Sequence, residues 1–299
     1  MRVDPYFAQK PLGALNAIQA REDQLIRELS SGTRVTQLSD DPQAIAQDLR
    51  IRAQQAADTS FMQAAATTMG RMQLVDSVMG SAVSQLTQAI SLTTSGANGT
   101  LSAANRQAIA SQLDGIRAEM LNLANTTYLG RSLFAGSLSG TTAFSLDTST
   151  SPATVTYHGD SDVLTQQTPS GGTAQISISG DRVFGAAGAD VFTPLSQAIA
   201  DLNGAASPAA LTADITALNT SLNRLTSVRA SFDAGITRMQ AAVTYTQSEQ
   251  TQLLASEDTL IGTDTASVAT DLKNAETQQS ALLSVMAQLG NQSLFNYLK

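Results

Sequence analysis

The residues that could carry out chemistry in this 299-residue chain are few, and their spacing argues against catalysis. His158 is the single histidine, so a two-histidine metal site is excluded, and a Ser-His-Asp triad would have to use a residue from a Ser/Thr/Gly-rich turn. The chain has no cysteine, and therefore no disulfide, thiolate metal ligand or cysteine nucleophile. No glycine-rich phosphate-binding motif occurs. We therefore expect no enzyme activity, no cofactor and no metal.

Two acidic clusters suggest a cation site or paired catalytic carboxylates, but local backbone roles explain them better. Asp160-Ser161-Asp162 lacks the glycine and the distal glutamate of a calcium loop, and its composition is typical of a turn. Asp40 and Asp41 directly precede Pro42. Asp41 suits the N-cap of a helix and Pro42 its first position, with both carboxylates at the positive end of the helix dipole. We predict a helix start at Asp41 and Pro42.

The composition favours thin seams between helices and excludes some classes of partner. Hydrophobic residues make up 42% of the chain but aromatic residues only 4%, so Ala, Leu, Ile, Met and Val must fill the core. The formal charge is −8 with no basic patch, which argues against nucleic acid. The first ten residues lack the apolar segment of a secretory signal, and no run of 18 apolar residues occurs, so we expect no membrane span.

Apolar residues recur three and four positions apart at both ends of the chain, which predicts heptad-patterned helices. These helices cover about residues 5–31, 42–94, 103–128, 194–260 with a break near 204–208, and 265 onwards. Arg229 is the one charged member of the longest stripe. The stripes of the two terminal helices form the candidate assembly interface: Leu15, Ile18, Leu25 and Leu29 near the N-terminus, and Val268, Leu272, Leu282, Met286, Leu289 and Leu294 near the C-terminus.

The middle of the chain has a different pattern. Residues 131–192 are rich in Ser, Thr and Gly, with short β-type runs at 154–157, 163–167 and 174–179. Ser170-Gly171-Gly172 is a turn signal between two of these runs. We expect a small β-rich insertion that forms a surface appendage between helices.

Together these patterns predict a mainly α protein. Long antiparallel heptad-patterned helices from both chain ends form a rod, with a small β-rich domain inserted in the middle. The expected parts are a terminal coiled-coil assembly region (1–33 with 263–299), a helical rod domain (34–135 with 193–262) and a β-rich outer domain (136–192).

Several segments resemble, in order, bacterial flagellins and flagellar hook-associated proteins. The resemblance covers both helical ends and skips most of residues 140–200. The segments that carry it are Leu29-Ser30-Ser31-Gly32-Thr33-Arg34, Ser39-Asp40-Asp41-Pro42, Asn105-Arg106 with Ile109-Ala110 and Gln112-Leu113, Leu123-Ala124-Asn125, Leu133-Phe134-Ala135-Gly136 and residues 274–289.

The resemblance implies a structural subunit of the bacterial flagellum that acts by coupled folding and self-assembly. Leu133-Phe134-Ala135-Gly136, Tyr157-His158-Gly159-Asp160 and the closing residues 293–298 are more similar to the hook-associated proteins than to filament flagellins. Implied partners are copies of the chain itself, a hook-associated neighbour on the hook side, flagellin on the filament side, an export chaperone and the flagellar type III export apparatus. The implied location is extracellular, at the hook–filament junction, without nucleic acid or membrane.

Two alternatives remain open at this point. The chain resembles flagellin enough to be the main filament subunit. A reading from another class is a secreted signalling or adhesive protein whose β-rich piece binds a host ligand.

Overall fold

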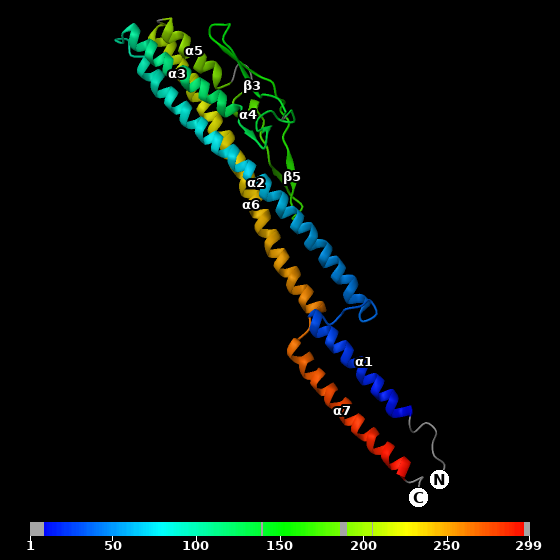
Figure 1. The fold of residues 1–299 in the computed structure, drawn as a ribbon. Coiled ribbons are helices and arrows are strands. Elements are labelled where there is room, and N and C mark those ends of the chain that lie inside the picture. Colours follow the sequence, from blue (N-terminus) through cyan, green and yellow to red (C-terminus); the bar gives the residue numbers. More distant parts are fainter. Residues whose placement is uncertain (1–8, 139, 186–189, 205, 296–299) are drawn as a thin grey trace. The chain divides into compact units, whose positions relative to one another are not determined.

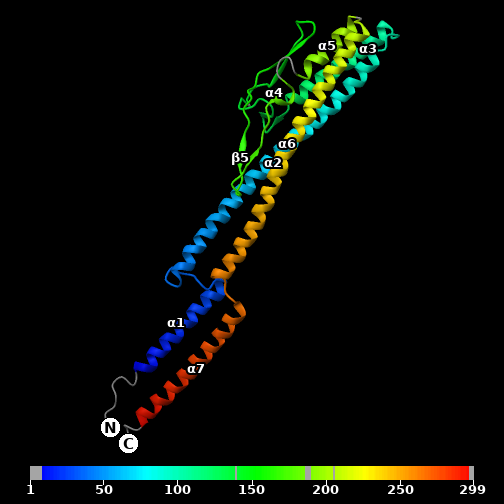
Figure 2. The same cartoon turned by 180° about the vertical axis from the view of Figure 1, so that it is seen from behind.

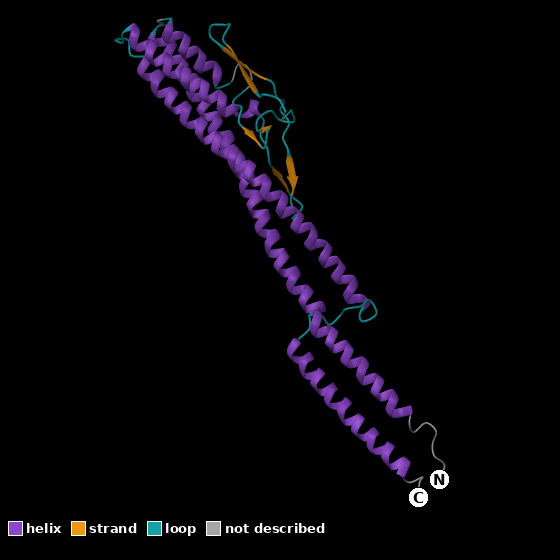
Figure 3. Cartoon of the chain, viewed as in Figure 1, coloured by secondary structure: helices purple, strands orange, loops and turns teal. Residues whose placement is uncertain are grey.

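The computed structural model describes residues 9–138, 140–185, 190–204 and 206–295, with long helices at both ends of the chain and short hairpins in the middle (Figures 1 and 3). A mainly α chain with a small β-rich middle region is therefore confirmed. The helices are α1 (Gln9–Ser31), α2 (Pro42–Gly96), α3 (Ala103–Ala124), α4 (Gly180–Val183), α5 (Phe192–Asn203), α6 (Pro208–Ile261) and α7 (Thr265–Phe295).

The chain divides into two compact units. The terminal unit comprises Met1–Asp58 and Ser248–Lys299, and the central unit comprises Thr59–Gln247. The helices α2 and α6 contribute residues to both units. The functional division into three parts stays a prediction.

Local signals fix the helix boundaries. The Asp41 carboxylate accepts a hydrogen bond from the backbone N–H of Ala44 at 3.0 Å, which caps α2, and Pro42 is the first residue of that helix. α1 ends before Gly32, whose φ of 70° is the left-handed conformation that glycine adopts without strain. The predicted breaks between α5 and α6 and between α6 and α7 are also present.

In the described part of the middle region the strands form three separate antiparallel hairpins. β3 (Phe144–Asp147) pairs with β4 (Thr154–Tyr157), and β5 (Thr165–Gln167) pairs with β6 (Thr173–Gln175) across the predicted turn at Gly171. β4 has the predicted bounds, whereas β1 (Thr127–Tyr128) and β2 (Arg131–Ser132) are too short to leave a sequence pattern.

The middle region shares one core with the helices, so the expectation of a surface appendage is wrong. The rings of Phe134 and Phe144 lie 5.2 Å and 5.5 Å from that of Phe184, measured between centroids, in edge-to-face contacts. These buried rings belong to one apolar cluster with Met72 of α2 and Leu225 of α6. The aromatic residues are scattered through a Ser/Thr-rich segment, and for that reason the sequence pattern hid their common position.

A partly buried ion pair explains the charged residue in the α6 stripe. The Nε and Nη2 atoms of Arg229 lie 2.6 Å and 3.0 Å from the two carboxylate oxygens of Asp76 on α2. This two-point contact fits the planar guanidinium to the carboxylate. Gly80 leaves room for it, since a Cβ there would lie 3.3 Å from Nη1.

A carboxyl pair links α5 to the start of α6. Asp214 on α6 is only 6% exposed. Burial, followed by the negative charge of Asp201 on α5, raises the pKa of Asp214 to about 6. Relative to the unfolded chain, folding of the central unit therefore shifts Asp214 toward its protonated form.

Phe184 tests whether the middle region is part of the core. Replacing Phe184 with Ala removes a fully buried ring and should lower the free energy of unfolding by about 3–5 kcal/mol. Urea unfolding followed by circular dichroism measures this change. Leu146→Ala, on the partly exposed β3 strand, is the control and should cost much less. Equal small effects would mean that the middle region folds separately from the helices.

Asp214 predicts a pH dependence of stability. Its folded pKa lies above the ordinary value of 3.8, so its stabilising contribution is complete below that value and is lost as the pH rises through about 6. Asp214→Asn keeps the group neutral and should raise the melting temperature by several degrees at pH 8 and by clearly less at pH 4.5, which lies between the two pKa values. The control is Asp162→Asn at an exposed position. A Tm gain that is the same at both pH values would contradict this assignment.

Candidate assembly interface

The terminal helices α1 and α7 lie side by side and antiparallel (Figures 1 and 2). Leu25 of α1 is 1% exposed and packs with Val268, Leu272 and Ala275 of α7 in a small apolar cluster. This single seam is the core of the helix pair.

The predicted stripe residues differ in how far the pair covers them. Besides Leu25, Val268 is buried, and Leu29 is exposed. Leu289 and Leu294 lie in the last turns of α7, where side chains are outside the described part of the structure. The half-buried members are Leu15, Ile18, Leu272, Leu282 and Met286.

Four further apolar residues lie beside the predicted stripes, and sequence reasoning missed them. Leu12 and Ile26 on α1 and Leu283 and Val285 on α7 are all about half exposed, Ile26 at 52% and Leu283 at 47%. Leu12 and Ile26 are two heptads apart and so repeat at the same helical position. Adding flanking positions to the stripe could have identified them.

The exposed apolar surface follows from the geometry of two helices. A pair of helices buries one line of side chains and leaves the flanking lines in water, whereas a bundle of more helices covers them. Covering one Leu or Ile side chain contributes about 1.5–3 kcal/mol. Additional helices packed against this pair would therefore gain several such contributions.

The two chain segments that lead into the helix pair are joined to each other. Thr33 and Gly262 form an antiparallel bridge, in which the N–H of Arg34 donates to the carbonyl of Ile261 at 2.7 Å. The N–H of Thr263 donates to the carbonyl of Gly32 at 3.2 Å. Beneath them Val35, Ala44 and Ile261 form a buried cluster. The segment that follows α1 and the segment that precedes α7 are therefore held together at this bridge.

Asp40 closes the loop before α2. Its carboxylate accepts hydrogen bonds from the backbone N–H groups of Gln37 and Thr36 at 2.9 Å and 3.1 Å. The bond from Gln37, followed by that from Thr36, lowers the pKa of Asp40. Asp40 and Asp41 thus serve the backbone, one in the loop and one at the helix start.

The two motifs of the middle region that carry the family resemblance, residues 133–136 and 157–160, contact each other. The hydroxyl of Tyr157 lies 2.8 Å from the carbonyl oxygens of Phe134 and Asp160. The Asp160 carboxylate accepts a hydrogen bond from the backbone N–H of Ser137 at 2.9 Å. Gly159 is required there, because a Cβ would lie 2.2 Å from the Tyr157 hydroxyl. These residues hold the middle region against the core.

His158 has a local contact in place of a catalytic arrangement. Its Nε2 atom lies 2.7 Å from the hydroxyl oxygen of Ser145, and both side chains are exposed on the β3–β4 hairpin. Within the described residues, no cluster of three or more His, Cys, Asp or Glu side chains could hold a metal ion. The same part of the chain contains no helix long and apolar enough to cross a membrane.

Comparisons with known proteins match both helical ends. The profile of the bacterial flagellin N-terminal helical region matches residues 6–139, and that of the bacterial flagellin C-terminal helical region matches residues 215–298. Flagellar hook-associated protein 3 of Salmonella typhimurium is 33% identical over 179 residues, which cover 60% of this chain and 54% of that protein. The matched segment thus spans about half the length of this relative.

Two solved structures share the fold. A putative flagellar hook-associated protein from Vibrio parahaemolyticus superposes with a TM-score of 0.67 at 18% identity, covering 74% of this chain and 99% of that one. The flagellar junction protein FlgL from Legionella pneumophila gives 0.59 at 16% identity, covering 72% of this chain and 99% of that one.

The chain belongs to the bacterial flagellin family, and flagellar hook-associated protein 3 is among the relatives that it matches. This family consists of structural flagellar proteins and is not a family of enzymes.

The helix pair predicts different effects for two leucines of one stripe. Leu25→Ala removes the centre of the buried seam, which typically costs about 2–5 kcal/mol, and should weaken hydrogen-exchange protection in α1 and α7 of the monomer. Leu29→Ala, at an exposed position of the same stripe, is the matched control and should leave that protection unchanged. An equal loss of hydrogen-exchange protection in both variants would show that Leu25 is not the centre of the α1–α7 seam.

Proposed function

We propose that this chain is an adaptor subunit that joins the hook-side axial proteins to the flagellin filament at the hook–filament junction. The observation that carries the proposal is the apolar surface left exposed on the α1–α7 pair. A subunit that assembles with copies of itself covers this surface with neighbouring terminal helices. Docking and completion of the terminal fold are then one coupled process.

The assembly interface of this proposal comprises the predicted stripes and the flanking residues. Leu25 belongs to the internal seam, so its contribution is to align α1 with α7. The surface offered to neighbours consists of the incompletely covered positions. These are Leu12, Leu15, Ile18, Ile26 and Leu29 on α1 and Leu282, Leu283, Val285 and Met286 on α7. The predicted stripe includes Leu289 and Leu294 as well, whose side chains are outside the described part of the structure.

The proposed partners follow from an adaptor position. One neighbour is a hook-associated protein on the hook side, and the other is flagellin on the filament side, with lateral contacts between copies of this chain. An export chaperone and the flagellar type III apparatus deliver the subunit to its extracellular site. The absence of cysteine is compatible with passage through a narrow channel, because no disulfide has to form or break.

The junction position is preferred over that of the main filament subunit. The relatives named above carry the names hook-associated protein 3 and junction protein FlgL. The motifs around Phe134 and Tyr157 resemble hook-associated proteins more than filament flagellins. In the central unit a hydrogen bond joins these two motifs. Immunogold labelling of intact flagella separates the two roles, since a junction protein gives one spot beside the hook and a filament subunit labels the whole filament.

Leu283 tests the assembly role without disturbing the monomer. Leu283→Asp places a charge on surface that the monomer leaves in water but that assembly must cover, so burial of the unpaired charge should prevent docking. Cells carrying this variant should keep their hooks, lack attached filaments and release unpolymerised flagellin into the medium. Electron microscopy and a blot of the supernatant are the readouts.

The matched control is Leu138→Asp in the central unit, since Leu138 is 49% exposed against 47% for Leu283. It should leave filaments attached. Normal filaments in the Leu283 variant would rule out this surface as an interface. Missing hooks would assign the protein to an earlier step of assembly.

A further inference from the structure

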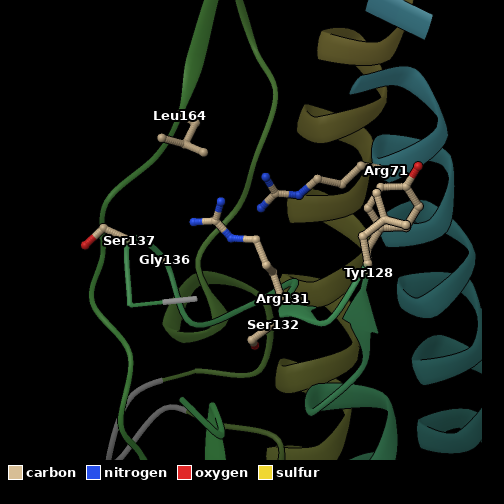
Figure 4. A pocket seen from close by; sticks show the side chains of 8 residues that line it. Arg71, Tyr128, Arg131, Ser132, Gly136, Ser137 and Leu164 are labelled. Atoms are coloured by element: carbon tan, nitrogen blue, oxygen red, sulfur yellow. The ribbon is translucent and has the colours of Figure 1, made fainter. Parts of the chain in front are cut away.

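Two arginine side chains of the central unit converge in one cavity. Figure 4 shows the guanidinium groups of Arg71 and Arg131 pointing into the same space. The cavity has a volume of about 250 Å³. Its lining comes from α2, the β1–β2 hairpin and the segments around Ser137 and Leu164.

The hairpin turn determines where Arg131 lies. Tyr128 and Arg131 are paired residues of β1 and β2, joined by Leu129 and Gly130, both with positive φ. Two consecutive positive φ values are typical of the tight turn whose twist matches paired strands. The turn therefore fixes the first residue of β2 beside α2.

Tyr128 supports the other guanidinium. Its ring is half-buried against the core, and its hydroxyl lies against α2, where a Cβ on Gly70 would be 3.4 Å away. In Figure 4 the stem of Arg71 runs beside this ring, and the hydroxyl points away from the two guanidinium groups. Tyr128 is thus a packing surface for Arg71, and the cavity presents positive charge.

The electrostatics of Arg71 indicate an electropositive environment. Burial, and then the positive charge of Arg131, lower the pKa of the Arg71 guanidinium. None of the ion pairs within the described residues includes Arg71. An oxyanion between two guanidinium groups relieves their repulsion and accepts charge-assisted hydrogen bonds.

We propose that this cavity binds the carboxylate of an Asp or Glu side chain from a second copy of this chain. The volume suits the head of a side chain. The chain carries 25 acidic against 17 basic residues, so packed copies bring more carboxylates than cations. A free inorganic oxyanion shares the same chemistry and is the competing source. The proposal rests on the self-assembly part of the proposed function.

The first experiment tests the oxyanion site in the monomer. Side-chain Nε–Hε resonances of arginine are followed by NMR during titration with sodium acetate and sodium sulfate, against sodium chloride at equal ionic strength. Arg71 and Arg131 should shift in a saturable way with both oxyanions. Arg71→Gln should abolish the saturation at Arg131, whereas Arg182→Gln, at an exposed arginine of α4, should leave it intact. Shifts that stay linear in anion concentration in the unaltered chain overturn the site.

The second experiment identifies the source of the oxyanion in assembled flagella. Arg71→Lys keeps the positive charge and introduces the sole lysine of residues 59–247, which a carbodiimide couples to a carboxylate in direct contact. A covalent dimer on a denaturing gel, with the linked peptide containing position 71, is the expected result. Arg182→Lys is the control and should give no dimer linked through position 182.

The outcomes separate the sources and keep this inference distinct from the junction role. Saturable anion binding with a dimer supports the proposal. Saturable binding without a dimer assigns the cavity to a free oxyanion and overturns the second copy as its source. Coupling of position 71 to a different protein overturns it as well. Failure of the junction role would show in the Leu283 variant and would leave the NMR result unchanged.

Discussion

The limited coverage that one helix gives another governs the terminal unit of this protein. Leu25 of α1 is buried against α7, while the next residue, Ile26, is half exposed on the flank of the same helix. No rotation of two helices buries both lines of side chains at once. The remaining apolar surface stays in contact with water in the monomer, and in the proposed function neighbouring subunits cover it.

The central unit does not share this constraint. Its helices and its middle region enclose one apolar cluster, in which the aromatic rings of Phe134, Phe144 and Phe184 fill space that Ala and Leu leave open. Within the terminal unit, the Thr33–Gly262 bridge joins the segments that enter and leave the helix pair. The central unit therefore encloses its own apolar core, whereas the terminal unit is the part that we propose neighbours to complete.

Sequence reasoning succeeded where the signal was local. The start of α2 at Pro42, the stop at Gly32 and the strand at 154–157 each depend on a few adjacent residues, and all are present. The heptad spacing likewise predicted the long helices. It placed Leu25 and Val268 in the buried seam, although their role in assembly remains a proposal.

Features that depend on distant residues could not be predicted. The aromatic residues of the core come from separated positions, so composition suggested an appendage where the structure has a shared core. Arg71 and Arg131 are brought together by a turn between strands of two residues. Ile26 and Leu283 were missed because heptad analysis follows the central line of a seam and not its flanks.

In the proposed assembly, neighbouring subunits cover the flanks of the α1–α7 pair. Because the chain has no cysteine, Ile26→Cys and Leu283→Cys each introduce a unique thiol for labelling with a maleimide. The measurement compares the labelling rate of each variant as a monomer and in isolated flagella. We expect rapid labelling of the monomer and at least a ten-fold slower rate after assembly. Equal rates in the two states would contradict it.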